Sequence, residues 1–246
     1  MKIIALYNMK GGVGKTASCV NLAYLSALEG EITLLWDLDP QGAATYYFNQ
    51  KAKLKGGAKR LVHKKTNLNQ FVQPTPYNRL DIIPADISNR KMDFLLDDKK
   101  KSELQFKKML KDLKQDYNYI FIDCPPVLSL LAENIFHAAD LVLFPMIPTT
   151  LSERVFQQVE KYFNRKNFDA NKLVPFYSMV DVRKKLHKDT MYQFSSDHKQ
   201  VMETSIPSSS LVERMGVHQA PLLTFSQRSK PAQAYKMLWK ELKQIG

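Results

Sequence analysis

The chain has 246 residues, of which 44% are hydrophobic, and its formal net charge at pH 7 is +12. This length fits one large domain or two small ones, and the hydrophobic content is enough to bury a substantial core. No stretch reaches the roughly 18 consecutive apolar residues of a membrane-spanning helix, and the N-terminus enters a predicted strand directly, so we expect neither a transmembrane segment nor a signal peptide. The positive charge favours a polyanionic partner such as DNA, RNA or an anionic membrane, with a generally basic, solvated surface as the alternative.

The first predicted unit is a strand, a glycine-rich turn and a helix. Residues 3–8 are apolar enough for a buried strand, and residues 16–29 have apolar side chains at helical spacing. Glycines between them let backbone N–H groups point inward at the helix N-terminus, where phosphates bind. The sequence therefore predicts a nucleotide site that consists of Lys10, Gly11, Gly12, Val13, Gly14, Lys15, Thr16 and Ala17.

This loop is a variant of the phosphate-binding pattern G-x-x-x-x-G-K-[ST]. Met9 stands where the strict pattern has glycine, and a second lysine, Lys10, opens the loop. In the pattern, Lys15 supplies a charge for the β- and γ-phosphates and Thr16 a hydroxyl for Mg²⁺. A tight turn with incidental lysines is the alternative, and the flanking strand and helix argue against it.

A second predicted strand, residues 32–36, ends in the sequence Asp37-Leu38-Asp39-Pro40-Gln41-Gly42. Carboxylates at the carboxyl end of a strand in an open α/β sheet lie where ligands bind. A carboxylate within reach of a γ-phosphate can hold and polarise water as a general base. The alternative is that Asp39 to Gly42 form an ordinary turn.

A third predicted strand, residues 119–123, is apolar and ends in Asp123, a pattern typical of a carboxylate that holds Mg²⁺ through water. The sequence Cys124-Pro125-Pro126 follows. A segment stiffened by two prolines beside a γ-phosphate is well placed to respond to nucleotide state. A strand that simply ends at prolines is the alternative.

The segments between these motifs are less informative. Residues 43–79 predict a helix, a basic loop and a short helix near residues 68–72, and the basic stretch 51–65 is either a solvated surface or a polyanion contact. We expect further strands at 80–85, 141–144 and 173–180. Helices are indicated by apolar stripes that consist of Phe106, Met109, Leu110 and Leu113; of Val155, Phe156, Val159, Tyr162 and Phe163, capped by Thr150 or Ser152; and of Tyr235, Leu238, Leu242 and Ile245, starting at Pro231.

The three motifs together resemble the ParA/MinD family of ATPases, whose deviant Walker A loop has the additional lysine. The resemblance implies that Lys10 reaches across an ATP-bound dimer to the partner's phosphates, and that Asp39 orients the attacking water. It makes Lys10, Lys15 and Asp39 the catalytic set, and Thr16, Asp37 and Asp123 the magnesium set. Ile206-Pro207 resembles the place where family members pack around adenine, which adds Pro207 to the nucleotide contacts.

The resemblance also implies a fold and a function. The expected fold is a P-loop NTPase, a single α/β domain over residues 1–246 with a doubly wound, mostly parallel sheet flanked by helices. The expected protein uses ATP and Mg²⁺, forms a homodimer in the ATP state, binds DNA non-specifically and positions a plasmid, chromosome or protein organelle. A ParB-like or cargo-adaptor protein would stimulate its weak hydrolysis in the cytoplasm, on the nucleoid. The residues expected to contact DNA are Arg214, Arg228, Lys230, Lys236 and Lys240.

Two other function classes use the same fold. A MinD-like membrane switch would need a terminal amphipathic anchor, whereas the last predicted helix is used for packing and the chain ends at Gly246. A metabolic ligase of the dethiobiotin synthetase type does not require Lys10 or the basic surface. A bridging iron–sulfur cluster, as in the related nitrogenase iron protein, is not expected because Cys19 lies in the helix under the loop. With Cys124 it reads as a reduced, structural thiol.

Overall fold

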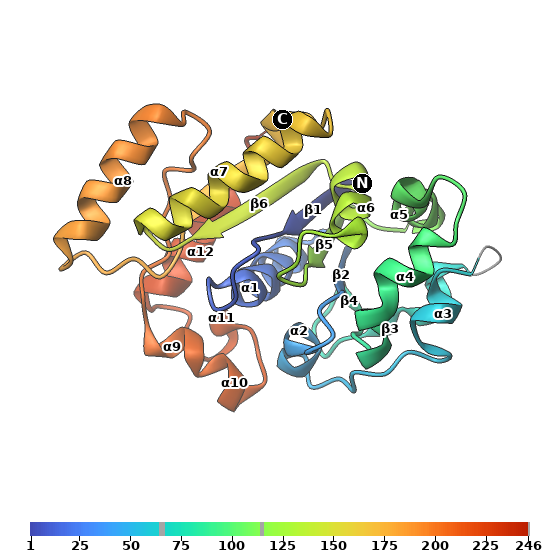
Figure 1. Cartoon of the computed structure of the whole chain (residues 1–246). Helices are drawn as coiled ribbons and strands as arrows, with labels where there is room; N and C mark the ends of the chain where they lie inside the picture. The colour runs from blue at the N-terminus through green and yellow to red at the C-terminus, as the bar shows by residue number, and fades with distance from the viewer. Residues whose placement is uncertain (64–66, 114–115, 246) are drawn as a thin grey trace.

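The computed structural model describes residues 1–63, 67–113 and 116–245. Within these residues a seven-stranded sheet has the order β3-β4-β2-β5-β1-β6-β7, and its strands are parallel except β3, which pairs antiparallel with β4. Helices flank the sheet on both faces (Figure 1). The strands are β1 (Lys2–Leu6), β2 (Thr33–Asp37), β3 (Gln73–Pro74), β4 (Leu80–Ile83), β5 (Tyr119–Asp123), β6 (Leu141–Met146) and β7 (Leu173–Tyr177).

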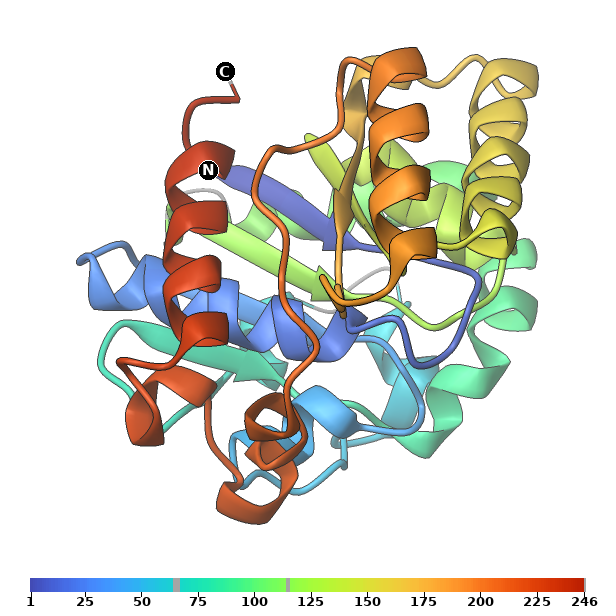
Figure 2. The same ribbon diagram turned by 90° about the vertical axis from the view of Figure 1, so that its left-hand side faces the viewer.

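One face of the sheet is covered by the first and last long helices, which contact each other and cross at a steep angle in Figure 2. This layer consists of α1 (Lys15–Leu28), α2 (Ala43–Tyr47), α9 (Ser210–Glu213), α10 (Met215–His218), α11 (Leu222–Phe225) and α12 (Lys230–Leu242). The opposite layer consists of α3 (Gly57–Leu61), α4 (Met92–Asp97), α5 (Gln105–Met109), α6 (Leu130–Ala138), α7 (Thr150–Arg165) and α8 (Lys185–Asp197). Short 3-10 helices are η1 (Leu68–Phe71), η2 (Ile87–Lys91), η3 (Ser102–Leu104), η4 (Leu110–Leu113) and η5 (Ala170–Lys172).

The central strands are buried on both faces, which explains their continuous apolar sequence. In β1 and just after it, Ile3, Ala5 and Tyr7 join the core under α6 and α7, whereas Ile4 and Leu6 join the core under α1 and α12. Alternating side chains of a strand point to opposite faces, so a strand between two helical layers needs apolar residues at every position. The doubly wound, mostly parallel α/β sheet expected from the sequence is confirmed.

Most predicted elements are present, with shifted ends. Strand β5 has the predicted bounds, whereas β7 stops at Tyr177 because Met179 turns the backbone with a φ of 56°. The predicted caps of α7 are wrong: the N-cap is Thr149, whose extended backbone lets its side chain accept from the Ser152 N–H. The predicted basic loop contains the short helix α3, while Lys64 and Lys65 of that stretch lie outside the described residues.

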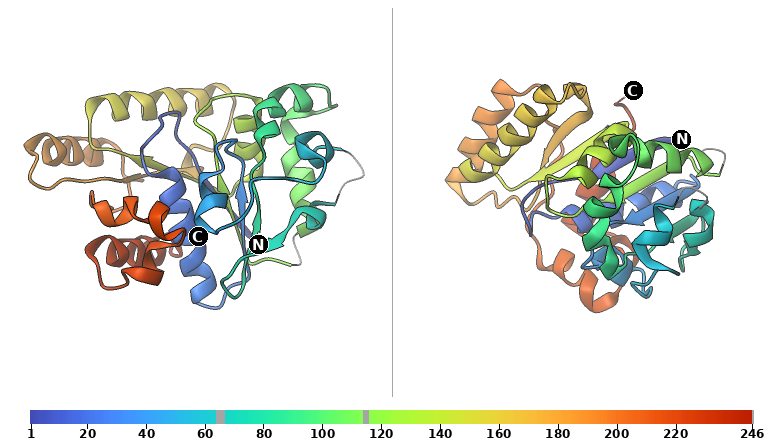
Figure 3. Two further views of the ribbon diagram at one scale, coloured as in Figure 1. Left: turned by 90° about the horizontal axis from the view of Figure 1, so that it is seen from below. Right: turned by 45° about the vertical axis from the view of Figure 1, so that its right-hand side comes forward.

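The last long helix is held against the sheet by its apolar stripe. Tyr235, Leu238 and Leu242 are buried as predicted, Trp239 joins them, and Ile245 is partly buried against the same core. Seen from below, this helix and the short helices before it form one group beside α1 (left panel of Figure 3). Across the described residues, the structure has no helix long and apolar enough to cross a membrane.

Candidate functional site

The glycine-rich loop joins β1 to α1 and depends on Gly14. This residue has a φ of 88°, in the left-handed region, and is the N-cap of α1. A Cβ at this position would lie 2.7 Å from Oγ of Ser178, a buried residue just after β7. Both backbone conformation and space therefore require glycine here. Gly12 is also left-handed, with a φ of 71°, whereas a Cβ at Gly11 would meet no atom within 4 Å.

Lys15 is almost fully buried, with 7% of its surface exposed. Its Nζ donates a hydrogen bond to the backbone oxygen of Lys10 across 2.8 Å, which links the two ends of the loop. Burial lowers the pKa of Lys15, and the nearby Asp123 carboxylate opposes that shift. A cation held in a partly desolvated loop is strongly attracted to a phosphate that enters it.

Asn8 fixes the start of the loop, and the sequence motifs did not identify it. Its side chain is fully buried, its Nδ2 donates to the backbone oxygen of Pro145 over 2.8 Å, and its Oδ1 accepts from the Lys10 N–H at the same distance. The loop is thereby tied to the carboxyl-terminal part of β6. The only sequence signal for this role is a polar residue between an apolar strand and the first loop lysine.

Two carboxylates predicted to bind magnesium are neighbours in the sheet. Asp37 ends β2, Asp123 ends β5, and the strand register places them opposite each other. Both are fully buried. Burial raises the pKa of each of them, and the negative charge of Asp37 raises the pKa of Asp123 further. Two buried carboxylates side by side are an arrangement that a cation would stabilise.

The two carboxylates differ in their hydrogen bonds. Neither oxygen of Asp123 makes a hydrogen bond of normal geometry to a described residue, although the hydroxyl of Thr16 is close enough to lower its pKa. Asp37 is occupied: its Oδ2 accepts from the Thr45 N–H (2.8 Å) and hydroxyl (2.7 Å), and its Oδ1 accepts from the Asp39 N–H (3.2 Å). Of the two carboxylates, Asp123 is therefore the one whose oxygens remain available to bind a metal ion. Asp37 instead orients the segment that follows β2.

The donor set fits a magnesium ion shared with a nucleotide. An unpaired buried carboxylate and a threonine hydroxyl are hard oxygen ligands, which Mg²⁺ prefers, and Mg²⁺ usually keeps waters and substrate phosphates as its other ligands. Among the described residues no group of three or more His, Cys, Asp or Glu side chains could hold a metal ion by itself. The site would thus depend on the phosphates of the nucleotide for its remaining ligands.

A cavity of about 500 Å³ opens at this end of the sheet. Its volume lies in the usual range of ligand pockets, about 300–1,000 Å³. It brings together residues from the loops after β1, β2 and β7 and from α9. Among the residues predicted to contact nucleotide or water, the lining includes Gly11, Gly12, Gly14, Lys15, Thr16, Ala17, Asp39 and Pro207.

Lys10, Val13, Asp37 and Asp123 are not in that lining. Val13, Asp37 and Asp123 are buried, whereas Lys10 is only half-buried. Ser178, Met179 and Tyr47 also line the cavity and were not predicted. Ser178 and Met179 follow β7, whereas Tyr47 ends α2, and none of them belongs to a motif that the sequence analysis identified.

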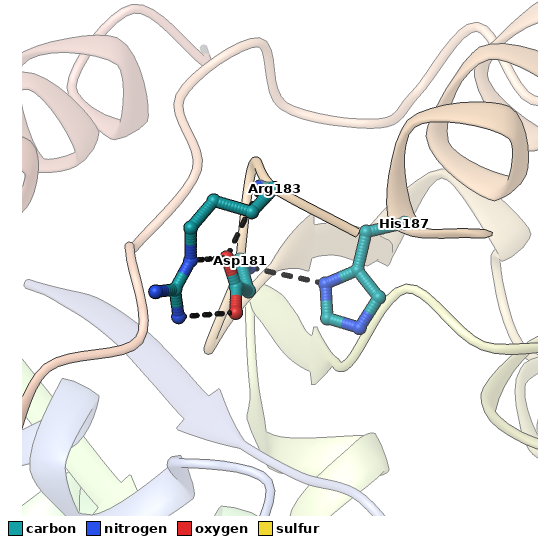
Figure 4. A network of polar contacts seen from close by, with 3 residues as sticks. All are labelled: Asp181, Arg183 and His187. Carbon is teal, nitrogen blue, oxygen red and sulfur yellow. Dashed lines mark hydrogen bonds and ion pairs between the residues drawn. The ribbon is translucent and has the colours of Figure 1, made fainter. Parts of the chain in front are cut away.

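The loop that leaves this cavity after β7 is stabilised by a small polar network (Figure 4). Arg183 Nε and Nη2 each donate to the Asp181 carboxylate over 2.9 Å. This pairing holds the pKa of Asp181 below its usual range. The Asp181 N–H donates to Nδ1 of His187, a buried side chain of α8, over 3.1 Å, so that ring nitrogen is unprotonated.

The cationic residues predicted to contact DNA lie near the C-terminal end of the chain. Arg214 joins α9 to α10, Arg228 and Lys230 lie at the start of α12, and Lys236 and Lys240 are four residues apart on one face of that helix. All are exposed except Lys236, which is partly exposed, and none forms an ion pair with a described carboxylate.

The loop after β1 and the carboxylates that end β2 and β5 define a P-loop nucleoside triphosphatase. A sequence model for a family described as "AAA domain" matches residues 1–174. The sporulation initiation inhibitor protein Soj of Bacillus subtilis is 32% identical over 250 residues, which cover 98% of each protein. The chromosome-partitioning ATPase Soj of Treponema pallidum is 31% identical over 246 residues, which cover 98% of this chain and 96% of that protein. The chain belongs to the ParA/MinD family of ATPases.

Solved structures extend the likeness to the fold. The crystal structure of cobyrinic acid a,c-diamide synthase from Mycobacterium smegmatis, with bound ADP and magnesium, has a TM-score of 0.83 at 24% identity. The match covers 99% of this chain and 94% of that chain. At this identity the likeness shows the fold alone. The family resemblance stated from the motifs is confirmed by the sequence relatives.

Proposed function

We propose that this protein is a ParA-type positioning ATPase, which dimerises around ATP, binds DNA non-specifically in that state and is reset by hydrolysis. The observation that supports this proposal most directly is the position of Lys10. It belongs to the loop, yet it is half-exposed and does not line the cavity of its own chain. A cation in this place is available to the phosphates of a second subunit.

The substrate is ATP, and Mg²⁺ is the cofactor. When bound, Mg²⁺ neutralises charge on the β- and γ-phosphates. Thr16 and Asp123 would hold the ion, because neither Asp123 oxygen has a hydrogen bond of normal geometry to a described residue and Thr16 lies beside it. Lys15 exchanges the backbone oxygen of Lys10 for phosphate oxygens. Asp37 orients the segment that contains Asp39 and, as the family resemblance implies, would act on the ion through water.

Asp39 is the residue we assign to the attacking water. It is partly exposed, lines the cavity and has an oxygen that accepts from the Gln41 N–H across 2.9 Å. That bond fixes the carboxylate without using its second oxygen. A carboxylate oriented in this way can hold water and accept its proton. Pro207, with Ile206 and Met179, would cover the base at another part of the cavity lining.

DNA binding is proposed for the exposed cations of α9–α12. They offer charge without any base-reading motif in the sequence, so contacts to phosphate are expected, independent of sequence and strongly dependent on salt. The Soj relatives are named for sporulation control and chromosome partitioning. By analogy, this protein would act in the cytoplasm on the nucleoid, with a ParB-like or cargo-adaptor partner that stimulates hydrolysis.

The two alternative classes find less support. A membrane switch needs an apolar helix face free to enter a lipid surface, and the face of α12 that contains Leu238 and Leu242 is buried. A metabolic ligase would need a second substrate, and the likeness to a diamide synthase extends only to the fold. Pelleting with anionic liposomes, and ATP turnover that requires a metabolite, are the observations that would favour these alternatives.

The proposal is tested by sedimentation velocity with no nucleotide, ADP or ATP in the presence of Mg²⁺. We expect a dimer with ATP only. Lys10→Ala should leave ATP binding to the monomer intact and weaken the dimer, whereas Lys51→Ala, an exposed lysine outside the site, should behave like the wild type. Normal dimerisation of the Lys10→Ala variant would contradict the crossover role of this lysine.

A further inference from the structure

Two large apolar side chains are exposed on one short helical stretch outside the nucleotide site. Ile87 in η2 is 60% exposed and Phe94 in α4 is 73% exposed. The buried residues of the same stretch, Asn89, Met92 and Leu96, alternate with them at helical spacing. We call the outward side, which consists of Ile87, Arg90, Lys91 and Phe94, the η2–α4 face.

This face is cationic as well as apolar. Arg90 and Lys91 are exposed between the two apolar side chains. A neighbouring segment adds further positive charge. Two hydrogen bonds hold it in place: the Leu54 N–H donates to Asp86 Oδ2 (2.8 Å), and the Ala58 N–H donates to Ser88 Oγ (2.7 Å). These bonds place next to η2 a segment whose exposed lysines are Lys53, Lys55 and Lys59.

These cations lack ion-pair partners among the described residues, and only Lys53 lies near enough to a carboxylate, that of Asp86, to lower its pKa. None of Arg90, Lys91, Lys53, Lys55 and Lys59 forms an ion pair with a carboxylate of a described residue. The acidic residues of this stretch are placed differently. Asp93 accepts a hydrogen bond from the Leu131 N–H over 2.7 Å, and Asp97 and Asp98 lie exposed at the far end of α4.

We propose that the η2–α4 face is a docking surface for a helical segment of a partner protein that has acidic residues beside apolar ones. The apolar part of such a segment would cover Ile87 and Phe94, and its carboxylates would face Arg90 and Lys91. DNA complements only the charge: its phosphates would leave two large apolar side chains uncovered and would meet Asp97 and Asp98. The observations therefore favour protein over nucleic acid.

Hydrogen bonds connect both ends of this face to segments that flank the nucleotide site. The Ala85 N–H, two residues before η2, donates to Thr45 Oγ1 (2.8 Å), and that hydroxyl donates to Asp37 (2.7 Å). On the other side, Asp93 of α4 accepts a hydrogen bond from the N–H of Leu131, the second residue of α6, which begins shortly after Pro125 and Pro126. This inference goes beyond the proposed function and does not depend on DNA binding.

The test uses the full chain and a fluorescein-labelled synthetic helical peptide with leucines on one face and glutamates on the flanking positions. Fluorescence anisotropy at low ionic strength should show saturable binding to the wild type. The double variant Ile87→Ser/Phe94→Ser should bind about tenfold more weakly or worse, because the apolar anchors are lost. Arg90→Glu/Lys91→Glu should also weaken binding. The control Tyr192→Ser, a residue 84% exposed on α8, should bind like the wild type.

Folding is checked by thermal unfolding, and since every substituted side chain is exposed, all variants should unfold like the wild type. Three results would overturn the proposal: no peptide binding, equal binding of a peptide whose leucines are replaced by serine, or full binding by the Ile87→Ser/Phe94→Ser variant. Binding of a DNA duplex in the presence of ATP is measured for the same variants, to test whether the face binds nucleic acid instead of protein. If the same double variant lost duplex binding in parallel, the face would belong to nucleic acid.

Discussion

At the scale of single residues, the nucleotide site is defined by groups whose chemistry is incomplete without a ligand. Asp123 is a fully buried carboxylate without a hydrogen-bond partner of normal geometry among the described residues, beside a second buried carboxylate, Asp37. Such a group destabilises the folded protein when it is charged. The free energy that this arrangement costs the unliganded protein is recovered when a cation and phosphates bind.

Substitution of Asp123 by asparagine tests this balance. The pKa of Asp123 is higher in the folded protein than in the unfolded chain, so the folded state binds more protons. The contribution of Asp123 to the stability of the unliganded protein therefore falls as pH rises toward its pKa in the folded state. Asp123→Asn removes the charge and should raise unliganded stability at pH 8 by roughly 1 kcal/mol or more. The gain should shrink as pH is lowered.

The measurement is thermal unfolding across pH without nucleotide, followed by a repeat with ATP and Mg²⁺. The variant should lose the stabilisation that Mg²⁺ adds to ATP binding. Asp98→Asn, at an exposed position, serves as the control and should change neither quantity. If the Asp123→Asn protein were less stable than the wild type at every pH, the charge of Asp123 would not destabilise the folded state.

Gly14 provides a second prediction at this scale. Gly14→Ala should destabilise the protein by about 1–3 kcal/mol, because alanine is strained at a positive φ and its Cβ would collide with Ser178. Nucleotide binding should be lost as well. Gly11→Ala is the matched control for stability, since its Cβ meets no atom within 4 Å. Chemical denaturation distinguishes the two variants, binding of a fluorescent ATP analogue is measured for Gly14→Ala, and an equal loss of stability in both variants would refute the explanation.

At the scale of elements, hydrogen bonds couple the segment after β2 to β4. Thr45 in α2 donates its hydroxyl to Asp37 and accepts from the Ala85 N–H just beyond β4. Replacement by the isosteric Thr45→Val removes both contacts and leaves a buried N–H unpaired. A loss of about 1–3 kcal/mol in the free energy of unfolding follows from that buried group.

Hydrolysis by the Thr45→Val protein should also fall, since Asp37, which orients the Asp39 segment, loses one of its three hydrogen bonds. The readouts are urea unfolding and phosphate release at saturating ATP. Thr204→Val, at a partly exposed threonine whose hydroxyl has no hydrogen bond to a described residue, is the comparison and should leave both unchanged. Unaltered hydrolysis in the Thr45→Val protein would separate the Asp39 segment from this hydrogen-bonded link.

The same scale shows what the sequence could predict. The loop at residues 10–16, strand β5 and the apolar stripe of α12 were predictable, because each depends on local spacing and on residue types with strong backbone or burial preferences. Ser178 against Gly14, Asn8 against Pro145 and Thr45 against Asp37 were not, since each depends on contacts between segments far apart in the sequence. The caps predicted for α7, Thr150 or Ser152, lie one or three residues after the observed N-cap, Thr149, because several threonine and serine side chains compete there and only the backbone conformation selects one.

At the scale of the whole molecule, the proposed cycle joins three surfaces. In this proposal the cavity would hold nucleotide, the edge near Lys10 would meet a second subunit, and the exposed cations of α9–α12 would meet DNA. Two subunits that close around ATP would double the number of these cations on one assembly. Each phosphate neutralised adds about 0.9 to the slope of log affinity against log salt, so dimer binding must be far more salt-sensitive than monomer binding.

The most direct test of this account is a mobility-shift titration of an arbitrary DNA duplex with no nucleotide, with ADP and with ATP, each with Mg²⁺ and at several salt concentrations. Asp39→Ala, which should bind ATP without hydrolysing it, holds the ATP state during the measurement. The account predicts binding with ATP only, lost steeply as salt rises, and prolonged in the Asp39→Ala protein. Binding that is the same with and without nucleotide, or no binding in any state, would contradict it.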